Sequence, residues 1–292
     1  MLAAVKSNSL DKVRRFTERG QGWSWWFQVK VFHAAVENNS LDVLKYLCEQ
    51  RCKWCRCPCA LAVIKGHRAA LEVLHEHGCP WDSSVAYECA AQGDLELLEW
   101  LRARGCPWDV MAYTSAIEKG HLHIVRYLHE HGCPVADDCR HRFINRAAEH
   151  GRLECLAYLH DQGYPWDART YAVASGRGHC ASKGHVEVVR YLHEHGCPWS
   201  EESFAGLLFT STVSKLECAR YMLAHGCPCP AEHRAHLVKN VVRRVVLPRW
   251  RAMVKVRPYA WHWLEEHAEK HWAPKGVGGK RDRAAFEAEF AS

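Results

Sequence analysis

The chain has 292 residues, of which 48% are hydrophobic and 25% charged, a composition typical of a globular protein and not of a disordered one. Its formal net charge is +6, and it holds 16 Cys and 13 Trp, many of each for this length. No apolar run approaches the roughly 18 residues that a transmembrane helix needs. The first apolar run, Leu2–Val5, is too short for the core of a secretion signal.

The absence of a recognisable export signal predicts an intracellular protein, cytoplasmic or nuclear, and not a secreted one. Its cysteines would then stand in a reducing compartment, where structural disulfides are rare. The disulfide scaffold that 16 Cys would suggest is therefore disfavoured.

A fixed interval recurs along the sequence. Eight residues that we name turn residues are Asn8, Asn39, Gly66, Gly93, Gly120, Gly151, Gly184 and Ser214. The residues that follow them at an interval of 13 are Gln21, Cys52, Cys79, Cys106, Cys133, Tyr164, Cys197 and Cys227. An interval kept in all eight units indicates a repeat architecture.

Each unit carries an amphipathic helix after its turn residue. In the clearest unit, which begins at Gly120, the apolar residues are Leu122, Ile124, Val125 and Leu128. This spacing places them on one face of a helix. A glycine then ends the helix, and in most units a proline two residues later prevents its continuation.

A second helix precedes each turn residue. Pairs of small residues, such as Ala90-Ala91 and Ala147-Ala148, stand two to four positions before the turn and allow two helices to approach closely. Glycine or asparagine at the turn itself accepts a left-handed backbone. Each unit therefore reads as helix, turn, helix and loop, and the stacking of such units predicts an all-α solenoid.

The pattern Ala-Ala-x-x-Gly-His-Leu-Glu-Val-Val-x-x-Leu-x-x-x-Gly, seen best in residues 182–192, resembles the ankyrin repeat. The resemblance covers residues 1–230 and implies about seven to eight helix-turn-helix repeats that bind another protein. The family's Thr-Pro-Leu-His opening is absent, and three successive repeats measure 27 residues where about 33 are usual. Because both helices are present, we expect short loops in place of the family's projecting β-hairpins.

The charge divides the chain into two predicted domains. Residues 1–230 contain equal numbers of basic and acidic residues, whereas residues 231–292 contain 13 basic and 7 acidic ones. We therefore expect a solenoid over 1–230, with an incomplete first unit, and a basic helical cap and tail over 231–292. Apolar residues between 237 and 246 recur at helical spacing, as in a helix that covers the last repeat.

Four connections exceed the 12 residues that separate Trp108 from the turn residue Gly120. They measure 16 residues from Trp23 to Asn39 and from Val135 to Gly151, 15 from Trp199 to Ser214 and 18 from Trp166 to Gly184. The last is the most informative. Gly178-His179 occupies the regular place of a turn, and Gly184-His185 repeats it six residues later. We interpret the insertion as a local duplication, and it predicts either a bulged loop near 176–184 or a helix longer by about two turns.

Six of the 16 cysteines occupy the repeat position, where they can act as small hydrophobic side chains. Equivalent atoms of stacked repeats lie roughly 10 Å apart, too far for a ladder of disulfides. The one cluster suited to a metal is Cys52, Cys55, Cys57 and Cys59, with Cys48 nearby. Cys-x-x-Cys spacing suits a zinc thiolate site, although no second such pair stands at zinc-finger distance.

Tryptophan stands two residues after the repeat position in six of the eight units. These side chains either wedge one repeat against the next or form an exposed aromatic row that binds a partner. Histidines also follow the repeat, and those directly before the terminal glycine suit the C-terminal end of a helix.

The sequence contains no nucleophile–base motif, phosphate-binding glycine loop or metalloprotease helix that we recognise. We therefore predict a non-enzymatic scaffold or adaptor, a monomer without a cofactor, that binds another protein on the solenoid surface. The candidate contact residues are Trp81, Trp108, Tyr113, Trp166 and Tyr171.

Two alternatives stay open. The first is a protein that binds nucleic acid or another anionic surface through the basic segment 233–264. Its candidate residues are Arg243, Arg244, Arg249, Arg251, Lys255 and Arg257. The second is a zinc-binding adaptor built on Cys48–Cys59.

Overall fold

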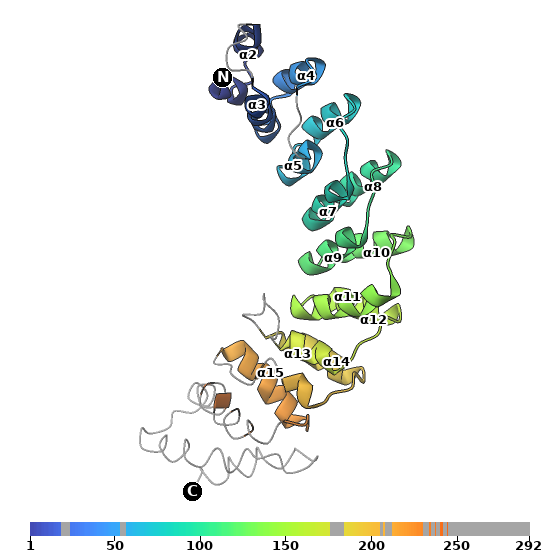
Figure 1. Cartoon of the computed structure of the whole chain (residues 1–292). Helices are drawn as coiled ribbons and strands as arrows, with labels where there is room; N and C mark the ends of the chain where they lie inside the picture. Colours follow the sequence, from blue (N-terminus) through green and yellow to red (C-terminus); the bar gives the residue numbers. More distant parts are fainter. Residues whose placement is uncertain are drawn as a thin grey trace, which may run out of the picture. The chain divides into compact units, whose positions relative to one another are not determined.

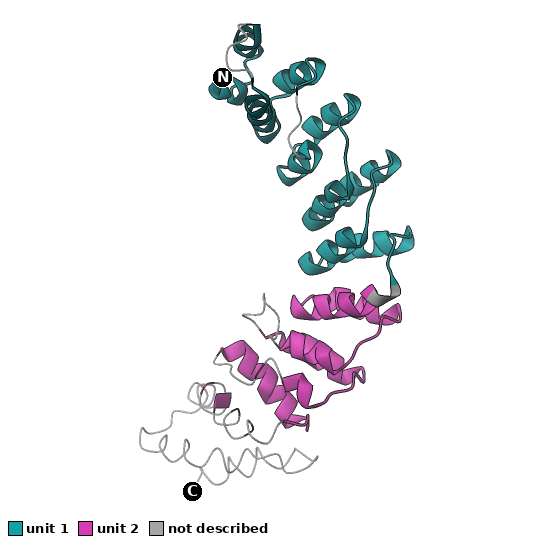
Figure 2. Ribbon diagram, viewed as in Figure 1, with its two compact units in different colours: residues 1–136 teal, residues 137–292 magenta. Residues whose placement is uncertain are grey.

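The computed structural model describes residues 1–18, 24–52, 57–175, 184–204, 207, 212–229, 234, 237, 240, 241 and 244. Every regular element in these ranges is helical, fifteen α-helices and one 3-10 helix (Figure 1). The described chain thus has the all-α, ankyrin-like helical repeat fold that the sequence predicts. It divides into two compact units, residues 1–136 and 137–292 (Figure 2).

Unit 1 is a stack of helix pairs in two layers (Figure 1). The first helices of the pairs, each in contact with the next, are α1 (Leu2–Lys6), α3 (Trp25–Glu37), α5 (Pro58–Ile64), α7 (Ser83–Gln92) and α9 (Val110–Lys119). The second helices are α2 (Leu10–Glu18), α4 (Leu41–Glu49), α6 (Arg68–Glu76), α8 (Leu95–Ala103) and α10 (Leu122–Glu130). The predicted helix-turn-helix order is therefore confirmed in this unit.

Unit 2 repeats the same pairing. Its helices are α11 (Asp137–Glu149), α12 (Leu153–Asp161), α13 (Ala168–Ala174), α14 (Val186–Glu194) and α15 (Val213–Ala224), with the 3-10 helix η1 (Glu201–Phe204) before α15. Helix α13 packs against α11 on one side and against η1 on the other, and α14 packs against α15. The turn residue Ser214 that the sequence predicted is wrong, because this residue lies inside α15.

Two of the irregular spacings have a simple origin. Helices α3 and α11 each have 13 residues, whereas the corresponding helices α7 and α9 have 10. The additional residues therefore lengthen the first helix of the pair. The insertion predicted near 176–184 falls on residues 176–183, which lie outside the described ranges. Of the predicted cap, Leu237 and Val241 are described, and both are buried.

Six of the eight predicted turn residues have the left-handed backbone that their identities predict: Asn8, Asn39, Gly66, Gly93, Gly120 and Gly151. The prediction is wrong for Gly184, whose φ is not positive. The φ angles are +48° at Asn8, +51° at Asn39, +78° at Gly93 and +84° at Gly120. Side chains with a Cβ rarely adopt this left-handed region, and asparagine is among those that do so most readily. The turn therefore requires one of two residue types, which is why the same types recur at this position.

The connections between repeats are short, and two of them, at 78–82 and 105–109, have the sequence Gly-Cys-Pro-Trp-Asp. The glycine ends one helix in a left-handed conformation, as at Gly105 (φ +77°). The aspartate starts the next helix: the Asp109 side chain accepts a hydrogen bond from the Met111 amide at 2.8 Å. In the part of the chain described, these connections contain no β-strand. The family's β-hairpin is thus replaced by a five-residue stop and start signal.

The repeat cysteine joins the end of a helical repeat to the residue that starts the same repeat. The Cys133 thiol donates to the carbonyl of Asp109 at 3.4 Å, and the Cys197 thiol donates to that of Asp167 at 3.5 Å. Burial raises the pKa of each of these two thiols to about 12, so both keep the proton that they donate. This cysteine therefore packs as a small hydrophobic residue and also binds a loop carbonyl.

A histidine after the turn glycine couples each such repeat to the one before it. His121 Nε2 lies 3.1 Å from the carbonyl oxygen of Ala91, and His185 Nε2 lies 3.1 Å from that of Glu149. The rings cover the preceding turn so closely that a Cβ built on Gly93 would lie 2.6 Å from His121 Nδ1. The turn glycine is thus required by the neighbouring repeat as well as by its own backbone.

We expect the Gly93→Ala variant to lose more stability than the Gly66→Ala variant. Both glycines have positive φ, which costs alanine about 1–2 kcal/mol, but a Cβ on Gly66 meets nothing within 4 Å. The additional loss at Gly93, about 1 kcal/mol, reflects the displaced His121 ring and its hydrogen bond. Urea unfolding measures both changes, and the two glycine variants should become equivalent when each is combined with His121→Ala. Equal losses in the wild-type background would contradict this assignment.

Candidate binding surface

Four loop tryptophans lie in the described ranges and are half-buried: Trp81, Trp108, Trp166 and Trp199. Each stacks on a side chain of its own repeat. His75 lies on Trp81 with ring centroids 4.1 Å apart, and His160 lies on Trp166 at 3.7 Å. His193 lies on Trp199 at 4.4 Å. The stacking residue stands nine positions after the turn glycine in every case, and therefore on the last turn of the second helix.

Arginine replaces this histidine in one repeat. The guanidinium carbon of Arg102 lies 3.8 Å from the centre of the Trp108 ring. The same guanidinium donates a hydrogen bond of 2.9 Å to the carbonyl of Cys106, two residues before the tryptophan. A cation or a ring that can become a cation thus covers one face of each of these indoles.

An aromatic residue of the following repeat meets three of these tryptophans edge-on. Within unit 1, Trp81 meets Trp100 at 6.1 Å and Trp108 meets Tyr127 at 6.0 Å. Within unit 2, Trp166 meets Tyr191 at 6.4 Å. The interplanar angles of 73° to 82° are those of edge-to-face aromatic pairs. Each of the three therefore joins two consecutive repeats.

A last residue completes each stack at the end of the second helix. His131 stacks on Tyr127 at 4.0 Å, and its Nδ1 lies 2.9 Å from the Tyr127 carbonyl oxygen. His195 and His225 make the same two contacts with Tyr191 and Tyr221. The predicted role of these histidines at helix C-termini is confirmed by these contacts.

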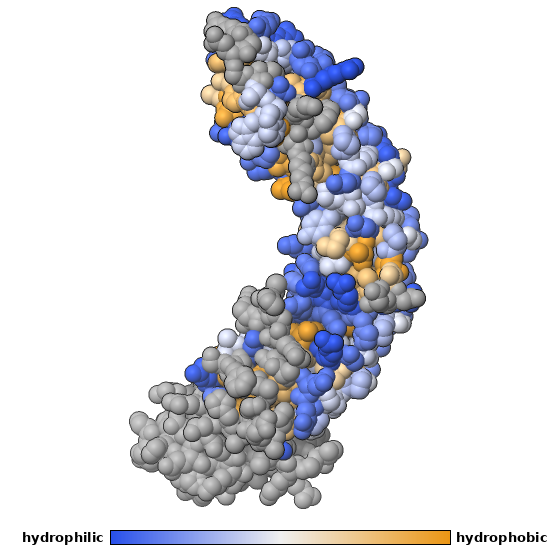
Figure 3. Space-filling model, viewed as in Figure 1, coloured by the Kyte–Doolittle hydropathy of each residue, from blue (hydrophilic) through white to orange (hydrophobic). Residues whose placement is uncertain are grey.

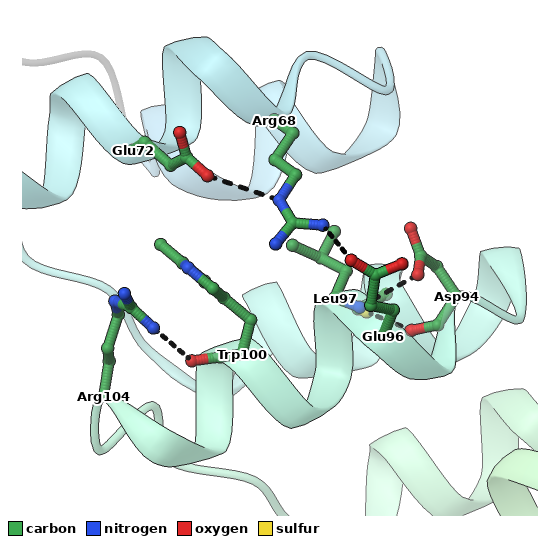
Figure 4. A network of polar contacts seen from close by, with 8 residues as sticks. Arg68, Glu72, Asp94, Glu96, Leu97, Trp100 and Arg104 are labelled. Carbon is green, nitrogen blue, oxygen red and sulfur yellow. Dashed lines mark hydrogen bonds and ion pairs between the residues drawn. The ribbon is translucent and has the colours of Figure 1, made fainter.

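Arginine again takes the histidine's place at Trp100 (Figure 4). Arg104 donates to the Trp100 carbonyl at 3.4 Å, and its guanidinium carbon lies 4.1 Å from the ring centre. Figure 4 also shows Arg68 of α6, which forms two ion pairs. Its Nε lies 3.3 Å from the carboxylate of Glu72 in the same helix, and its Nη1 lies 2.8 Å from that of Glu96 in α8. These exposed ion pairs add little stability but keep the second helices in register.

We name the loop tryptophans and the rings and guanidinium groups around them the aromatic–histidine row. In unit 1 it comprises His75, Trp81, Trp100, Arg102, Arg104, Trp108, Tyr127 and His131. In unit 2 it comprises His160, Trp166, Tyr191, His193, His195, Trp199, Tyr221 and His225. On the face drawn in Figure 3, hydrophobic residues form separate patches among hydrophilic ones.

The sequence singled out only part of this row. It contains Trp81, Trp108 and Trp166. Their half-burial is compatible with either role proposed for them, a wedge between repeats or a partner-binding surface. The flanking histidines, arginines and tyrosines were missed as candidate contacts. Their signal was present, because they recur seven, nine and eleven positions after the turn residue.

Tyr113 and Tyr171 are not surface residues, and their prediction as contact residues is wrong. Both side chains have no exposed surface, and the Tyr171 hydroxyl donates to the carbonyl of Cys197 at 3.1 Å. Desolvation by burial raises the pKa of Tyr171 well above its ordinary value. Both rings are part of the core, and the Tyr171 ring also lies 5.5 Å from that of the loop residue Trp199.

Only some residues of the candidate zinc site and of the basic segment lie in the described ranges. Cys52 and Cys59 are buried, Cys57 is half-buried and Cys55 lies outside the described residues. No group of three or more potential metal ligands occurs among the described residues. Of the basic candidates only Arg244 is described, and it is exposed, whereas Arg243, Arg249, Arg251, Lys255 and Arg257 lie outside the described ranges. The zinc and nucleic-acid alternatives stay predictions.

A comparison with protein families now decides the identity of the repeats. A model of three ankyrin repeats matches residues 86–170. Residues 86–170 are ankyrin repeats. No curated protein matches the chain. None of the helices in the described residues has the length and apolar character needed to cross a membrane.

Acid should destabilise the repeats of unit 2 through the row. The pKa of His193 is lowered, first by desolvation and second by His225, against a smaller opposite effect of Glu194. The unfolded chain therefore binds a proton at His193 more readily than the folded chain, so stability falls as the pH drops through the ordinary histidine pKa of about 6.5. Thermal melting between pH 7.5 and 5.5 measures this loss, and it should be smaller in the His193→Gln variant.

The matched control is His129→Gln. His129 occupies the same position of its repeat, but Val135 replaces the tryptophan and the His129 side chain is exposed. We expect this variant to keep the pH dependence of the wild type. The assignment fails if His129→Gln flattens the profile as much as His193→Gln does.

Proposed function

We propose that this protein is a non-enzymatic binding module whose protein partner contacts the aromatic–histidine row. Ankyrin repeats are in general protein–protein interaction modules, and the family is typically non-enzymatic. The observation that carries the choice of surface is the ordered set of half-buried tryptophans, each covered on one face and met edge-on by the next repeat.

The chemistry of the row suits a protein interface. Tryptophan, tyrosine and arginine are the residues that most often dominate binding energy, because they combine apolar area with a hydrogen-bonding group. Here the rings are already fixed by stacking, so a partner does not have to order them. Binding to pre-ordered side chains costs less conformational entropy than binding to free ones.

The row also repeats with the architecture. Trp81 and Trp108 stand one 27-residue repeat apart, on successive pairs of the same unit. Neighbouring helix pairs pack about 10 Å apart, so an elongated partner segment can meet equivalent groups at a regular interval. Within one unit, this regularity favours an extended segment over a compact knob that fills one pocket.

The test replaces two indole rings by smaller aromatic rings that keep the stacking contacts. In the Trp81→Phe/Trp108→Phe variant a phenyl ring keeps the contacts with His75 and Arg102, whereas the indole N–H and part of the apolar area are lost. We expect the partner affinity to fall at least tenfold, about 1.4 kcal/mol, with a melting temperature close to that of the wild type. Quantitative affinity capture followed by titration of the captured partner measures the change.

Met111→Ala is the control for general loss of exposed apolar surface. Met111 is 51% exposed on α9 and lies outside the row. Its variant should bind as the wild type does. If the phenylalanine variant binds fully while Met111→Ala does not, the partner uses the first helices and the row is structural only.

A further inference from the structure

Large hydrophobic side chains are exposed at the start of unit 1. The described residues contain seven such side chains, and four of them stand within the first 26 residues of the chain: Leu2, Phe16, Trp25 and Trp26. The two tryptophans are 67% and 55% exposed, respectively. Single exposed apolar residues are common on proteins, but a group of them marks a surface that binds something.

The helix-turn-helix topology brings these four residues to the same end of their helices. Leu2 begins α1, Phe16 lies in the last turn of α2, and Trp25 begins α3. The turn at Asn8 reverses the chain between α1 and α2, and α1 packs against both α2 and α3 (Figure 1). We name Leu2, Phe16, Trp25 and Trp26 the N-terminal patch.

Helix α3 projects beyond the first helix that follows it. The turn residues Asn39 and Gly66 align Val31 of α3 with Pro58, the first residue of α5. Helix α3 already begins at Trp25, six residues earlier, which corresponds to about 9 Å of helix. The first turn of α3 therefore has no part of helix α5 beside it, and its two indoles are exposed for this reason.

A long first helix does not by itself require tryptophan at this place. Helix α11 also has 13 residues and, like α3, ends two residues before its turn residue. Asp137 and Asp138 stand where α3 has Trp25 and Trp26. Acidic residues suit the first turn of a helix, because the N-terminal end of the helix dipole is positive. The tryptophans of α3 therefore serve something other than the extension of the helix.

Both indoles are held in place on α3. The Ser24 side chain accepts a hydrogen bond of 3.4 Å from the Phe27 amide and so caps the helix. The rings of Trp25 and Trp26 meet edge-on, with centroids 5.9 Å apart. Lys30 Nζ lies 5.1 Å from the centre of the Trp26 ring. A cation thus accompanies the exposed aromatic pair.

The segments that carry the N-terminal patch are positively charged. Within residues 1–18 and 24–30 there are five basic and two acidic residues, all exposed. The basic residues are Lys6, Lys12, Arg14, Arg15 and Lys30, and the acidic ones are Asp11 and Glu18. Arg14 and Arg15 directly precede Phe16. Exposed apolar side chains therefore occur together with an excess of positive charge, which is complementary to an anionic surface.

We propose that the N-terminal patch binds the surface of an anionic lipid membrane. Tryptophan rings lie preferentially at the headgroup level of a bilayer, where phenylalanine and leucine insert at the boundary of the acyl chains. Lysine and arginine attract the anionic headgroups. A fluid surface accommodates apolar side chains from the ends of three helices without a matching pocket. The patch lies outside the aromatic–histidine row, so this contact does not depend on the proposed protein partner.

The experiment measures co-sedimentation of the full chain with two kinds of vesicle, phosphatidylcholine alone and phosphatidylcholine with about 30% phosphatidylserine. We expect binding to the anionic vesicles to be about tenfold stronger and to weaken with added salt, which screens the attraction. The Trp25→Ala/Trp26→Ala variant should bind these vesicles about tenfold more weakly than the wild type. Its melting temperature should stay close to that of the wild type, because both side chains are exposed.

Ile64→Ala/Met111→Ala is the matched control. These two side chains are 50% and 51% exposed on other first helices of unit 1 and lie outside the N-terminal patch. The control variant should bind the anionic vesicles as the wild type does. Arg14→Gln/Arg15→Gln should bind them more weakly, with a smaller dependence on salt.

Three results would overturn the proposal. The first is a wild type that binds neither kind of vesicle, and if the tryptophan variant then loses affinity for a captured protein, the patch docks a protein. The second is equal binding of both kinds of vesicle by the wild type. The third is binding of the tryptophan variant at the wild-type level, which would assign the affinity to another part of the chain, such as the basic segment 233–264.

Discussion

The left-handed turn between the two helices of a repeat is the constraint on which the other contacts depend. It brings a nine-residue second helix back along the first, so that the buried face of one lies on the buried face of the other. In α10, Ile124, Val125 and Leu128 are fully buried, whereas Leu122, at the start of the same apolar stripe, is half-buried. The turn glycine also leaves room for the imidazole of the next repeat. A single backbone conformation therefore serves the helix pair and its attachment to a neighbour.

The repeats are held together at two places that differ in chemistry. Near the turn, a histidine such as His121 reaches a backbone carbonyl of the preceding first helix. At the other end of the second helix, a loop tryptophan such as Trp108 stacks on its own repeat and meets the next one edge-on. Neither contact is strong alone, because each involves a half-buried side chain. Their recurrence stabilises a stack in which no single helix pair buries enough apolar area to fold by itself.

The periodic features could be predicted from the sequence, because each repeat reports the same contact again. The left-handed residues, the helix pairs and the histidines at helix ends were accessible in this way. The burial of Tyr113 and Tyr171 was not, because an aromatic residue on a first helix suits either face and only the packed neighbours decide. Position 214 failed for a related reason: serine has no special backbone preference, so an interval of 13 residues alone could not distinguish a turn from the second residue of a helix.

The candidate binding surface was likewise predictable from the sequence only in part. The loop tryptophans were found through their interval, but the groups that cover them come from other positions and change type, histidine in one repeat and arginine in another. A search for identical residues does not see them. A search for side chains that can offer a positive charge to an aromatic face does, because His75 and Arg102 share that ability and stand at equivalent places.

The five-residue connection has a consequence for how such an array can change its length. Two successive repeats of unit 1 end with the same glycine, cysteine, proline, tryptophan and aspartate, at 78–82 and 105–109. The tryptophan presents one surface to its own repeat and a different one to whatever repeat follows. A 27-residue module copied or removed at this junction regenerates both surfaces without a new side chain. Gene duplication can therefore add a repeat to the array without further changes at the connection.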